Sequence, residues 1–309
     1  MYDLIGDIHG YATELKSLLT KMGYQEIGGV WQHPERKVIF VGDFVDRGPE
    51  QVETVRIAQS MVESGNALAV MGNHEFNAVC WATPDPENPR EYLRPHTAKN
   101  QGQHQAFLDQ VGEGSDQHKS MIKWFKTLPV YLDLPGLRVV HACWHPRYLA
   151  EIGQFTDDQN RLLPEAWEAS SRKGSLAYDT IETLLKGLEI PLPPGHYFLD
   201  KDENKRTDIR TKWWQTEKLT YRDLAMVPGS EIEKIPHEPV EADILPGYNG
   251  EKPVFVGHYW LKGEPAPLSD HIACLDYSVA GENGGKLCAY RWSAEKELRK
   301  DKFEWVIGR

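Results

Sequence analysis

The stretch Gly42-Asp43-Phe44-Val45-Asp46-Arg47-Gly48 directly follows an apolar run, residues 37–41, that has the composition of a buried strand. Two more polar motifs stand in the same position. Gly6-Asp7-Ile8-His9-Gly10 follows the apolar residues 2–5, and Gly72-Asn73-His74-Glu75 follows residues 67–71. Open α/β sheets bind their ligands at the carboxyl ends of the strands. The three motifs are therefore expected to meet at one edge of a sheet.

Two later segments repeat the pattern of a strand followed by a polar residue. His141 ends the apolar residues 137–141, and Gly257-His258 follows residues 253–256. Together the five segments supply carboxylate, amide and imidazole ligands, a set that favours Mn, Fe or Zn over Ca²⁺. We expect a first ion to be held by Asp7, His9 and Asp43, and a second by the bridging Asp43 with Asn73, His141 and His258. Two ions about 3.5–4 Å apart can share a hydroxide and hold phosphate oxygens during in-line displacement.

The remaining polar residues of the motifs fit the other roles in phosphoester hydrolysis. His74 follows a predicted ligand and is placed to protonate the leaving oxygen, with Asp46 as the partner that orients its ring and raises its pKa. Arg47 offers a planar fork of donors for a phosphoryl group. Asn73 is also predicted to contact the substrate.

Whole-chain composition is that of a soluble globular protein and excludes several other classes. The 309 residues are 40% hydrophobic and carry a formal net charge of −11, which argues against general binding of nucleic acid. No apolar stretch is long enough to span a membrane. The first motif lies so near residue 1 that we expect no signal peptide. The four cysteines show no close pairing in sequence, so a reducing, cytoplasmic location is expected.

The chain is expected to form one domain, residues 1–309, with a capping insertion at residues 146–250 where the strand pattern weakens. A helix is expected at residues 51–63. The polar residues 77–117 are expected to run over the surface, with the histidines of this region, His96, His104 and His118, facing solvent. Within the insertion, Trp213-Trp214 is either a packing element or a surface that stacks on a base.

The motifs Gly-Asp-Ile-His-Gly, Gly-Asp-Phe-Val-Asp-Arg-Gly and Gly-Asn-His-Glu resemble the signature motifs of the calcineurin-like metallophosphoesterases. The Arg47 that follows Asp46 is typical of the phosphoprotein-phosphatase branch. The resemblance covers residues 1–80, 136–146 and 250–292. It implies an α/β (α+β layered) fold, a β-sandwich flanked by helices, with Mn or Fe as the usual ions. It also implies a second phosphate-binding arginine upstream of His258, for which Arg206 and Arg210 are the candidates; we select Arg210.

The late motif departs from the pattern of many members. Where they carry Gly-His-x-His, this chain has Gly257-His258-Tyr259-Trp260, which favours phosphomonoesterases over phosphodiesterases. The same segment, with Leu275-Asp276-Tyr277-Ser278 and the Gly-Gly-Lys-Leu at residues 284–287, is also similar to the symmetrical diadenosine tetraphosphate hydrolases.

Three classes of function remain open. The leading one is a phosphoesterase that hydrolyses phosphomonoesters, including phosphoserine or phosphothreonine, by attack of a hydroxide held between two metal ions. The second is a hydrolase of diadenosine tetraphosphate or another nucleoside polyphosphate. The third, an inactive binding scaffold, is disfavoured because the ligand set is complete and His74 and Asp46 are both present. The expected partner is a phosphorylated protein or a small phosphoester or nucleotide.

Overall fold

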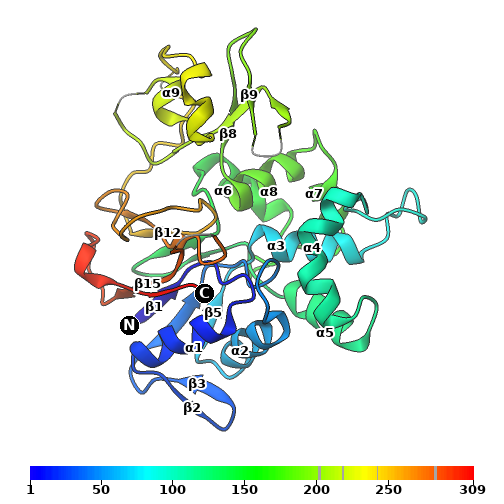
Figure 1. Cartoon of the computed structure of the whole chain (residues 1–309), viewed down its shortest axis with the longest axis vertical. Helices are drawn as coiled ribbons and strands as arrows, with labels where there is room; N and C mark the ends of the chain where they lie inside the picture. The colour runs from blue at the N-terminus through cyan, green and yellow to red at the C-terminus, as the bar shows by residue number, and fades with distance from the viewer. Residues whose placement is uncertain (201–202, 218, 242, 282–283) are drawn as a thin grey trace.

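The computed structural model describes residues 1–309 except 201–202, 218, 242 and 282–283 (Figure 1). Its larger sheet has the strand order β14-β15-β1-β4-β5, and β16 also pairs with β15. The strands are β1 (Tyr2–Ile5), β4 (Lys37–Phe40), β5 (Ala67–Ala69), β14 (Asp276–Tyr277), β15 (Lys286–Trp292) and β16 (Phe303–Ile307). Strands β1, β4 and β5 are parallel. The loops after these three strands therefore emerge at the same edge, as the sequence predicted.

A second sheet has the order β13-β12-β7-β6. It consists of β6 (Tyr131–Asp133), β7 (Arg138–Val140), β12 (Val254–Val256) and β13 (Ile272–Cys274). Strand β12 is parallel to both β7 and β13. The loops that carry His141 and His258 therefore also leave their sheet together.

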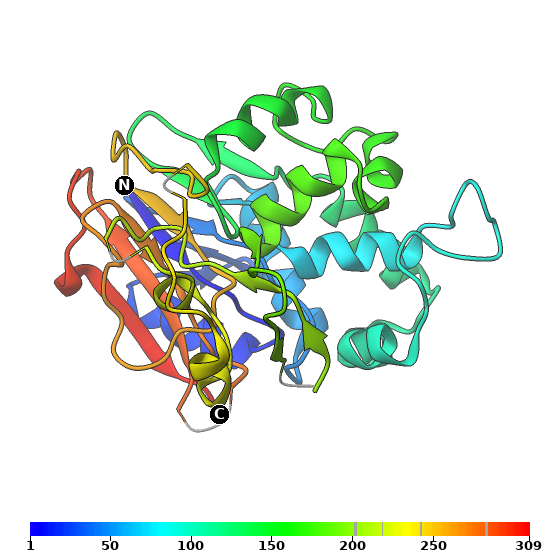
Figure 2. The same ribbon diagram turned by 90° about the horizontal axis from the view of Figure 1, so that it is seen from above.

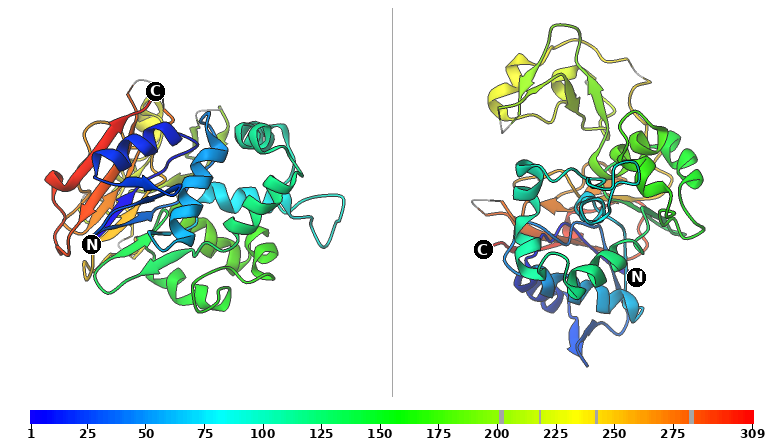
Figure 3. Two further views of the ribbon diagram at one scale, coloured as in Figure 1. Left: turned by 90° about the horizontal axis from the view of Figure 1, so that it is seen from below. Right: turned by 90° about the vertical axis from the view of Figure 1, so that its right-hand side faces the viewer.

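The side chains of the strands alternate between two apolar clusters, as the period of two residues requires. Leu4 and Ile39 of the larger sheet share one cluster with Val139 and Phe255 of the second sheet, so this cluster fills the space between the sheets. Ile5 points the other way and packs with the helices α1 (Ala12–Lys21) and α2 (Gln51–Glu63). Figure 3 shows α1 lying across the strands when the molecule is seen from below. The predicted β-sandwich flanked by helices is confirmed.

Further helices continue from the third motif and cover the edge of the sheets. They are α3 (Asn73–Ala82), α4 (Ala98–Val111) and α5 (Asp116–Phe125). In Figure 2 the cyan helices lie on the opposite side of the molecule from the red strands of the C-terminal region. The expectation of a surface excursion at residues 77–117 is wrong for α4, which packs on α2 and buries Phe107 and Leu108. Residues 86–91 and 95–97 are exposed as expected.

The predicted insertion, residues 146–250, contains two structurally different parts. Its first helices, α6 (Pro146–Glu151), α7 (Ala166–Ser171) and α8 (Leu176–Lys186), bury Trp167 and Leu184 in the main core. The rest has an apolar cluster of its own around Ile190, Ile209 and Ile235. It contains β8 (Glu189–Pro191), β9 (Phe198–Leu199), β10 (Lys205–Arg206), β11 (Asp208–Arg210) and α9 (Tyr221–Leu224). Figure 3 shows this yellow-green part projecting at one end of the molecule.

The other elements are short and lie away from the motifs. They are the hairpin β2 (Gln25–Ile27) and β3 (Val30–Gln32) and the 3₁₀ turns η1 (Ile152–Gln154), η2 (Gly229–Lys234) and η3 (Lys300–Lys302). None of the helices in the described part of the chain has the length and apolar character needed to cross a bilayer.

Candidate two-metal site

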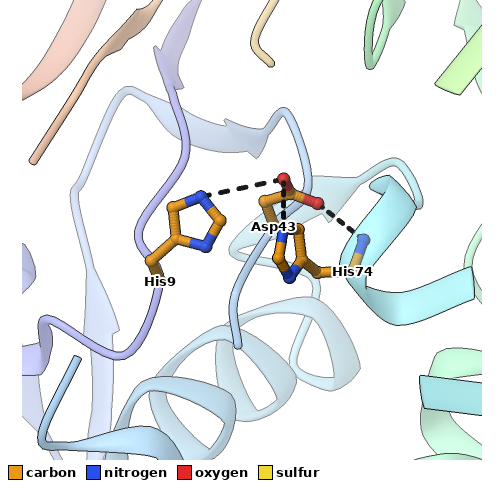
Figure 4. Close-up of side chains that lie close together, drawn as sticks. All are labelled: His9, Asp43 and His74. Carbon is orange, nitrogen blue, oxygen red and sulfur yellow. Dashed lines mark hydrogen bonds and ion pairs between the residues drawn. The ribbon is translucent and has the colours of Figure 1, made fainter. Parts of the chain in front are cut away.

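Asp43 lies at the centre of the motif residues. Its Oδ2 is 3.8 Å from His9 Nε2, 3.9 Å from His74 Nε2 and 3.2 Å from His141 Nε2. Figure 4 shows the rings of His9 and His74 directed at this carboxylate from two sides. The structure thus brings histidines from three separate motifs to one oxygen atom.

Asn73 links the other two predicted ligands. Its Oδ1 is 2.7 Å from His258 Nδ1 and 3.2 Å from His141 Nε2. Asp7 lies against the same loop, since its Oδ2 accepts a hydrogen bond of 3.0 Å from the backbone N–H of His258. All six residues predicted to hold metal, Asp7, His9, Asp43, Asn73, His141 and His258, are therefore neighbours.

Backbone contacts fix which ring nitrogens are available for a metal. His9 Nδ1 is 2.9 Å from the carbonyl oxygen of Val45, and His141 Nδ1 is 2.7 Å from that of Val41. In each pair Nδ1 is the donor, so Nε2, which faces Asp43, is the nitrogen that a metal could bind. Burial lowers the pKa of His9 to about 3, so its ring is neutral, as a ligand must be.

The unpaired polar atoms at the site are those that a bound metal would need. In the described residues, three buried polar atoms at the site have no hydrogen-bond partner: Asp7 Oδ1, His9 Nε2 and His258 Nε2. Buried polar atoms are normally paired, so such a cluster indicates a missing ligand. Two groups of donor atoms lie within 4.8 Å of one another, one of His9, Asp43 and His74 and one of Asp43, His141 and His258. Asp43 belongs to both groups, which agrees with its predicted bridging role.

Three predicted ligands adopt the left-handed backbone region. The φ angles are 50° at His9, 53° at Asp43 and 72° at His258. Residues other than glycine rarely adopt this region, and such residues are concentrated at functional sites. Two glycines allow the loops to approach: a Cβ at position 72 would lie 2.1 Å from Asp43 Oδ1, and one at position 257 would lie 2.0 Å from Asp7 Oδ1.

Glu75 supports Asp43 and was assigned no role from the sequence. Its buried carboxylate accepts hydrogen bonds from the backbone N–H groups of Asp43, at 2.8 Å, and Phe44, at 2.8 Å. It also accepts a bond of 3.0 Å from Gly72, three residues earlier. Glutamate three residues into a helix is a capping signal, and that signal was present in the sequence. Glu75 therefore fixes the second motif against the third.

His74 and Asp46 form the predicted pair. His74 Nδ1 lies 2.5 Å from Asp46 Oδ2. Burial favours the neutral ring, but the charges of Asp43 and Asp46 outweigh it and raise the pKa of His74. Asp46 has a second partner, because His104 Nδ1 lies 2.7 Å from its Oδ1. The expectation that His104 and His118 face solvent is wrong, since they are 2% and 4% exposed, whereas His96 is exposed as expected.

Asp43, Asn73, His74 and His258 line a cleft of about 600 Å³. Arg47 lines it, with its guanidinium 4.4 Å above the ring of Trp260. Arg206 and Arg210 also line this cleft, and each lies near Glu189 Oε1, at 3.6 Å for Arg206 Nη2 and 3.4 Å for Arg210 Nη2. The selection of Arg210 over Arg206 stays a prediction.

The tryptophan pair of the insertion packs inside the protein. Trp213 is 1% exposed and donates its indole N–H to the carbonyl oxygen of Ala142 and to the hydroxyl of Tyr259, at 3.1 Å and 3.0 Å. Trp214 is 8% exposed. Neither ring has a face free for a base, so the packing interpretation is confirmed.

Comparison with known proteins agrees with this geometry. The family model of the calcineurin-like phosphoesterases matches residues 2–258. The chain belongs to this family, and the predicted resemblance and enzyme class, a phosphoric ester hydrolase, are confirmed at that level. Among the relatives is a protein of Bacillus subtilis named bis(5'-nucleosyl)-tetraphosphatase PrpE [asymmetrical], 43% identical over half of this chain and 61% of its own length. A protein of the same name from Oceanobacillus iheyensis is 31% identical over 45% of this chain and 54% of its own length.

Solved structures share the fold at low sequence identity. A protein serine/threonine phosphatase from Saccharomyces cerevisiae with similarity to human phosphatase PP5 matches 99% of this chain and 79% of its own, with a TM-score of 0.50 and 15% identity. A cold-active protein-tyrosine phosphatase of Shewanella matches 94% of this chain and 75% of its own, with a TM-score of 0.50 and 16% identity. This chain therefore shares the fold of both, and spans little more than half the length of the two curated relatives above.

Proposed function

We propose that the chain is a two-metal hydrolase of nucleoside polyphosphates, of which diadenosine tetraphosphate is the first to test. The observation that carries this proposal is the composition of the cleft. We call the part of the cleft lined by Asp43, Asn73, His74 and His258 its metal end. The cleft has a volume of about 600 Å³, and Arg47, Arg206 and Arg210 also line it. Pockets of about 300–1,000 Å³ suit ligands much larger than one phosphate group. The name of the Bacillus subtilis relative, a bis(5'-nucleosyl)-tetraphosphatase, supports the same class of substrate.

Asp7, His9, Asp43, Asn73, His141 and His258 would hold the two ions. Mn, Fe or Zn suits these donors, and when bound, such ions polarise phosphate oxygens and make water nucleophilic at neutral pH. The Glu75 carboxylate accepts hydrogen bonds from the backbone N–H groups of Asp43, Phe44 and Gly72. These bonds fix the position of the Asp43 carboxylate before substrate binds.

Arg47 orients the reacting phosphoryl group through its planar fork of donors, and the ring of Trp260 limits where the guanidinium can lie. His74 donates a proton from Nε2 to the leaving oxygen. Its Nδ1 is occupied by Asp46, which holds the ring in place and favours the protonated form. This division of roles follows the logic of general acid catalysis.

Hydrolysis of phosphomonoesters, including phosphoserine or phosphothreonine, is the second candidate. The burial of Trp213 and Trp214 favours it, because the stacking surface expected for a nucleotide base is missing at these two residues. A monoester needs only the groups at the metal end of the cleft. An inactive scaffold remains the third and weakest interpretation.

The test is a side-by-side assay of the enzyme loaded with Mn, Fe or Zn after chelation. We expect kcat/KM to be highest for diadenosine tetraphosphate, lower for p-nitrophenyl phosphate and lowest for a phosphopeptide. If kcat/KM is highest for the phosphopeptide, phosphomonoester hydrolysis is the function. Absence of turnover with all three substrates and all three metals would overturn both candidates.

A further inference from the structure

A second group of polar residues lines the cleft away from the predicted metal ligands. Arg94 lies in the loop before α4, and Asn100 and Gln103 lie on α4 itself. The Arg94 guanidinium donates through Nη2 to Gln103 Oε1 at 2.8 Å and approaches Asn100 Oδ1 at 3.4 Å. Both partners are neutral amides. Over the described part of the chain, no carboxylate forms an ion pair with Arg94.

A nearby arginine shows the contrasting arrangement. Arg172, just after α7, pairs with Asp85 at 2.5 Å and with Glu168 at 3.1 Å. Arg94 is half-buried, as Arg172 is, but has no such carboxylate partner in the described structure. Burial lowers its pKa, and the charges of Asp46 and Glu182 offset this only in part. A partly desolvated cation that no carboxylate contacts is costly, and an anion in the cleft would reduce that cost.

Ser170, on α7, presents a second unused group in the same cleft. It is 1% exposed, it lines the cleft, and its Oγ has no hydrogen-bond partner in the described structure. A buried hydroxyl normally finds a partner. Lys186 of α8 lines the same wall, where Glu182 of the preceding turn holds its ammonium group. Donors from the loop before α4, from α7 and from α8 therefore line the same cleft.

We propose that Arg94, Ser170 and Lys186 form a second anion subsite, which binds the phosphate groups of a polyphosphate chain beyond the one that reacts. Asn100 and Gln103 position the Arg94 fork, and Arg94 and Ser170 donate to non-bridging phosphate oxygens. The subsite selects substrates with two or more linked phosphates over phosphomonoesters. It rests on the proposed function only in assuming that the reacting phosphate lies at the metal end.

The test compares two ligands that do not need turnover. The Mn-loaded protein is titrated calorimetrically with methylenediphosphonate, a non-hydrolysable chain of two phosphate-like groups, and with orthophosphate. In Arg94→Gln we expect the ratio of the two Kd values to shift by about tenfold against methylenediphosphonate, since a hydrogen bond to a charged group is lost. Arg90→Gln is the matched control, because Arg90 is exposed and lies outside the cleft lining.

A second variant changes the ratio in the opposite direction and keeps a near-isosteric side chain. Glu182→Gln removes a negative charge from the cleft wall and frees Lys186, so methylenediphosphonate should bind several-fold more tightly relative to orthophosphate. An unchanged ratio in both variants, or equal losses for the two ligands in Arg94→Gln, would overturn the subsite. The binding result stands whatever the turnover assays give, so failure of the subsite and failure of the proposed function are distinguishable.

Discussion

The metal end of the cleft and its far wall are built in different ways. Every predicted metal ligand follows a strand by only a few residues, as Asp7 follows β1 and His258 follows β12. The far wall, in contrast, is assembled from helices that are distant in sequence, with Arg94 before α4, Ser170 on α7 and Lys186 on α8. The two sheets thus set the chemistry, whereas the packing of helices sets which substrate reaches it.

The largest effect should come from the centre of the metal end. Among the described residues, Asp43 is the only one common to the two donor groups at this site, so Asp43→Asn should release both ions and lower kcat by about 10³-fold or more. Elemental analysis of the purified variant, with circular dichroism as a control for folding, measures this. If the variant still binds two ions per chain and has a near-normal rate, Asp43 is not the bridging ligand.

His74→Asn should separate acid catalysis from metal binding. We expect about 10²–10⁴-fold slower hydrolysis of esters with poor leaving groups, and a smaller loss for p-nitrophenyl phosphate, whose leaving group needs little protonation. Both ions should remain. Equal losses for the two kinds of ester would contradict the role of acid, and loss of an ion would make His74 a ligand, as its distance from Asp43 also allows.

Asp46→Asn should change the pH dependence. Burial lowers the pKa of His74, and Asp43 and Asp46 raise it above its ordinary value, so the ring stays protonated to higher pH in the native enzyme. Without Asp46 the pKa falls, and the rate for alkyl phosphates relative to p-nitrophenyl phosphate should begin to decline at lower pH. We expect a loss of about tenfold at neutral pH, in the range for partners of catalytic groups. If the pH dependence of this rate ratio is the same in Asp46→Asn as in the native enzyme, Asp46 does not raise the pKa of His74.

The smallest effect on catalysis is expected from the tryptophan pair. Trp213→Phe removes a buried N–H that two oxygens accept, so the free energy of unfolding should fall by about 1–3 kcal/mol, measurable by urea denaturation. The KM values for diadenosine tetraphosphate and p-nitrophenyl phosphate should change in parallel. A rise in KM for diadenosine tetraphosphate alone would indicate that Trp213 contacts the substrate.

The sequence predicted the metal end well because its information is local. The helix expected at residues 51–63 matches α2, and the strand expected at residues 2–5 matches β1. Each motif is a strand followed by a turn, and parallel strands bring such turns together without further information. The six ligands were therefore expected together before any distance was known.

The far wall could not be predicted in this way. The polar sequence of α4 gave no clear helical period, so His104 was expected in solvent although it contacts Asp46. Arg94 and Ser170 carry no motif, and only tertiary packing places them in one cleft. The division of the insertion into two parts also depends on tertiary packing. Leu184 packs in the main core, whereas Ile209 packs in the separate cluster of the insertion.

The left-handed backbone at His9, Asp43 and His258 ties metal supply to the survival of the protein. Each such residue costs about 1–2 kcal/mol relative to an ordinary conformation. Ions that bind only the folded chain offset this cost by mass action, adding about 1.4 kcal/mol for every tenfold rise in free ion above Kd. We therefore expect a metal-starved cell to lose molecules of this enzyme to proteolysis, in addition to the catalytic rate of those that remain.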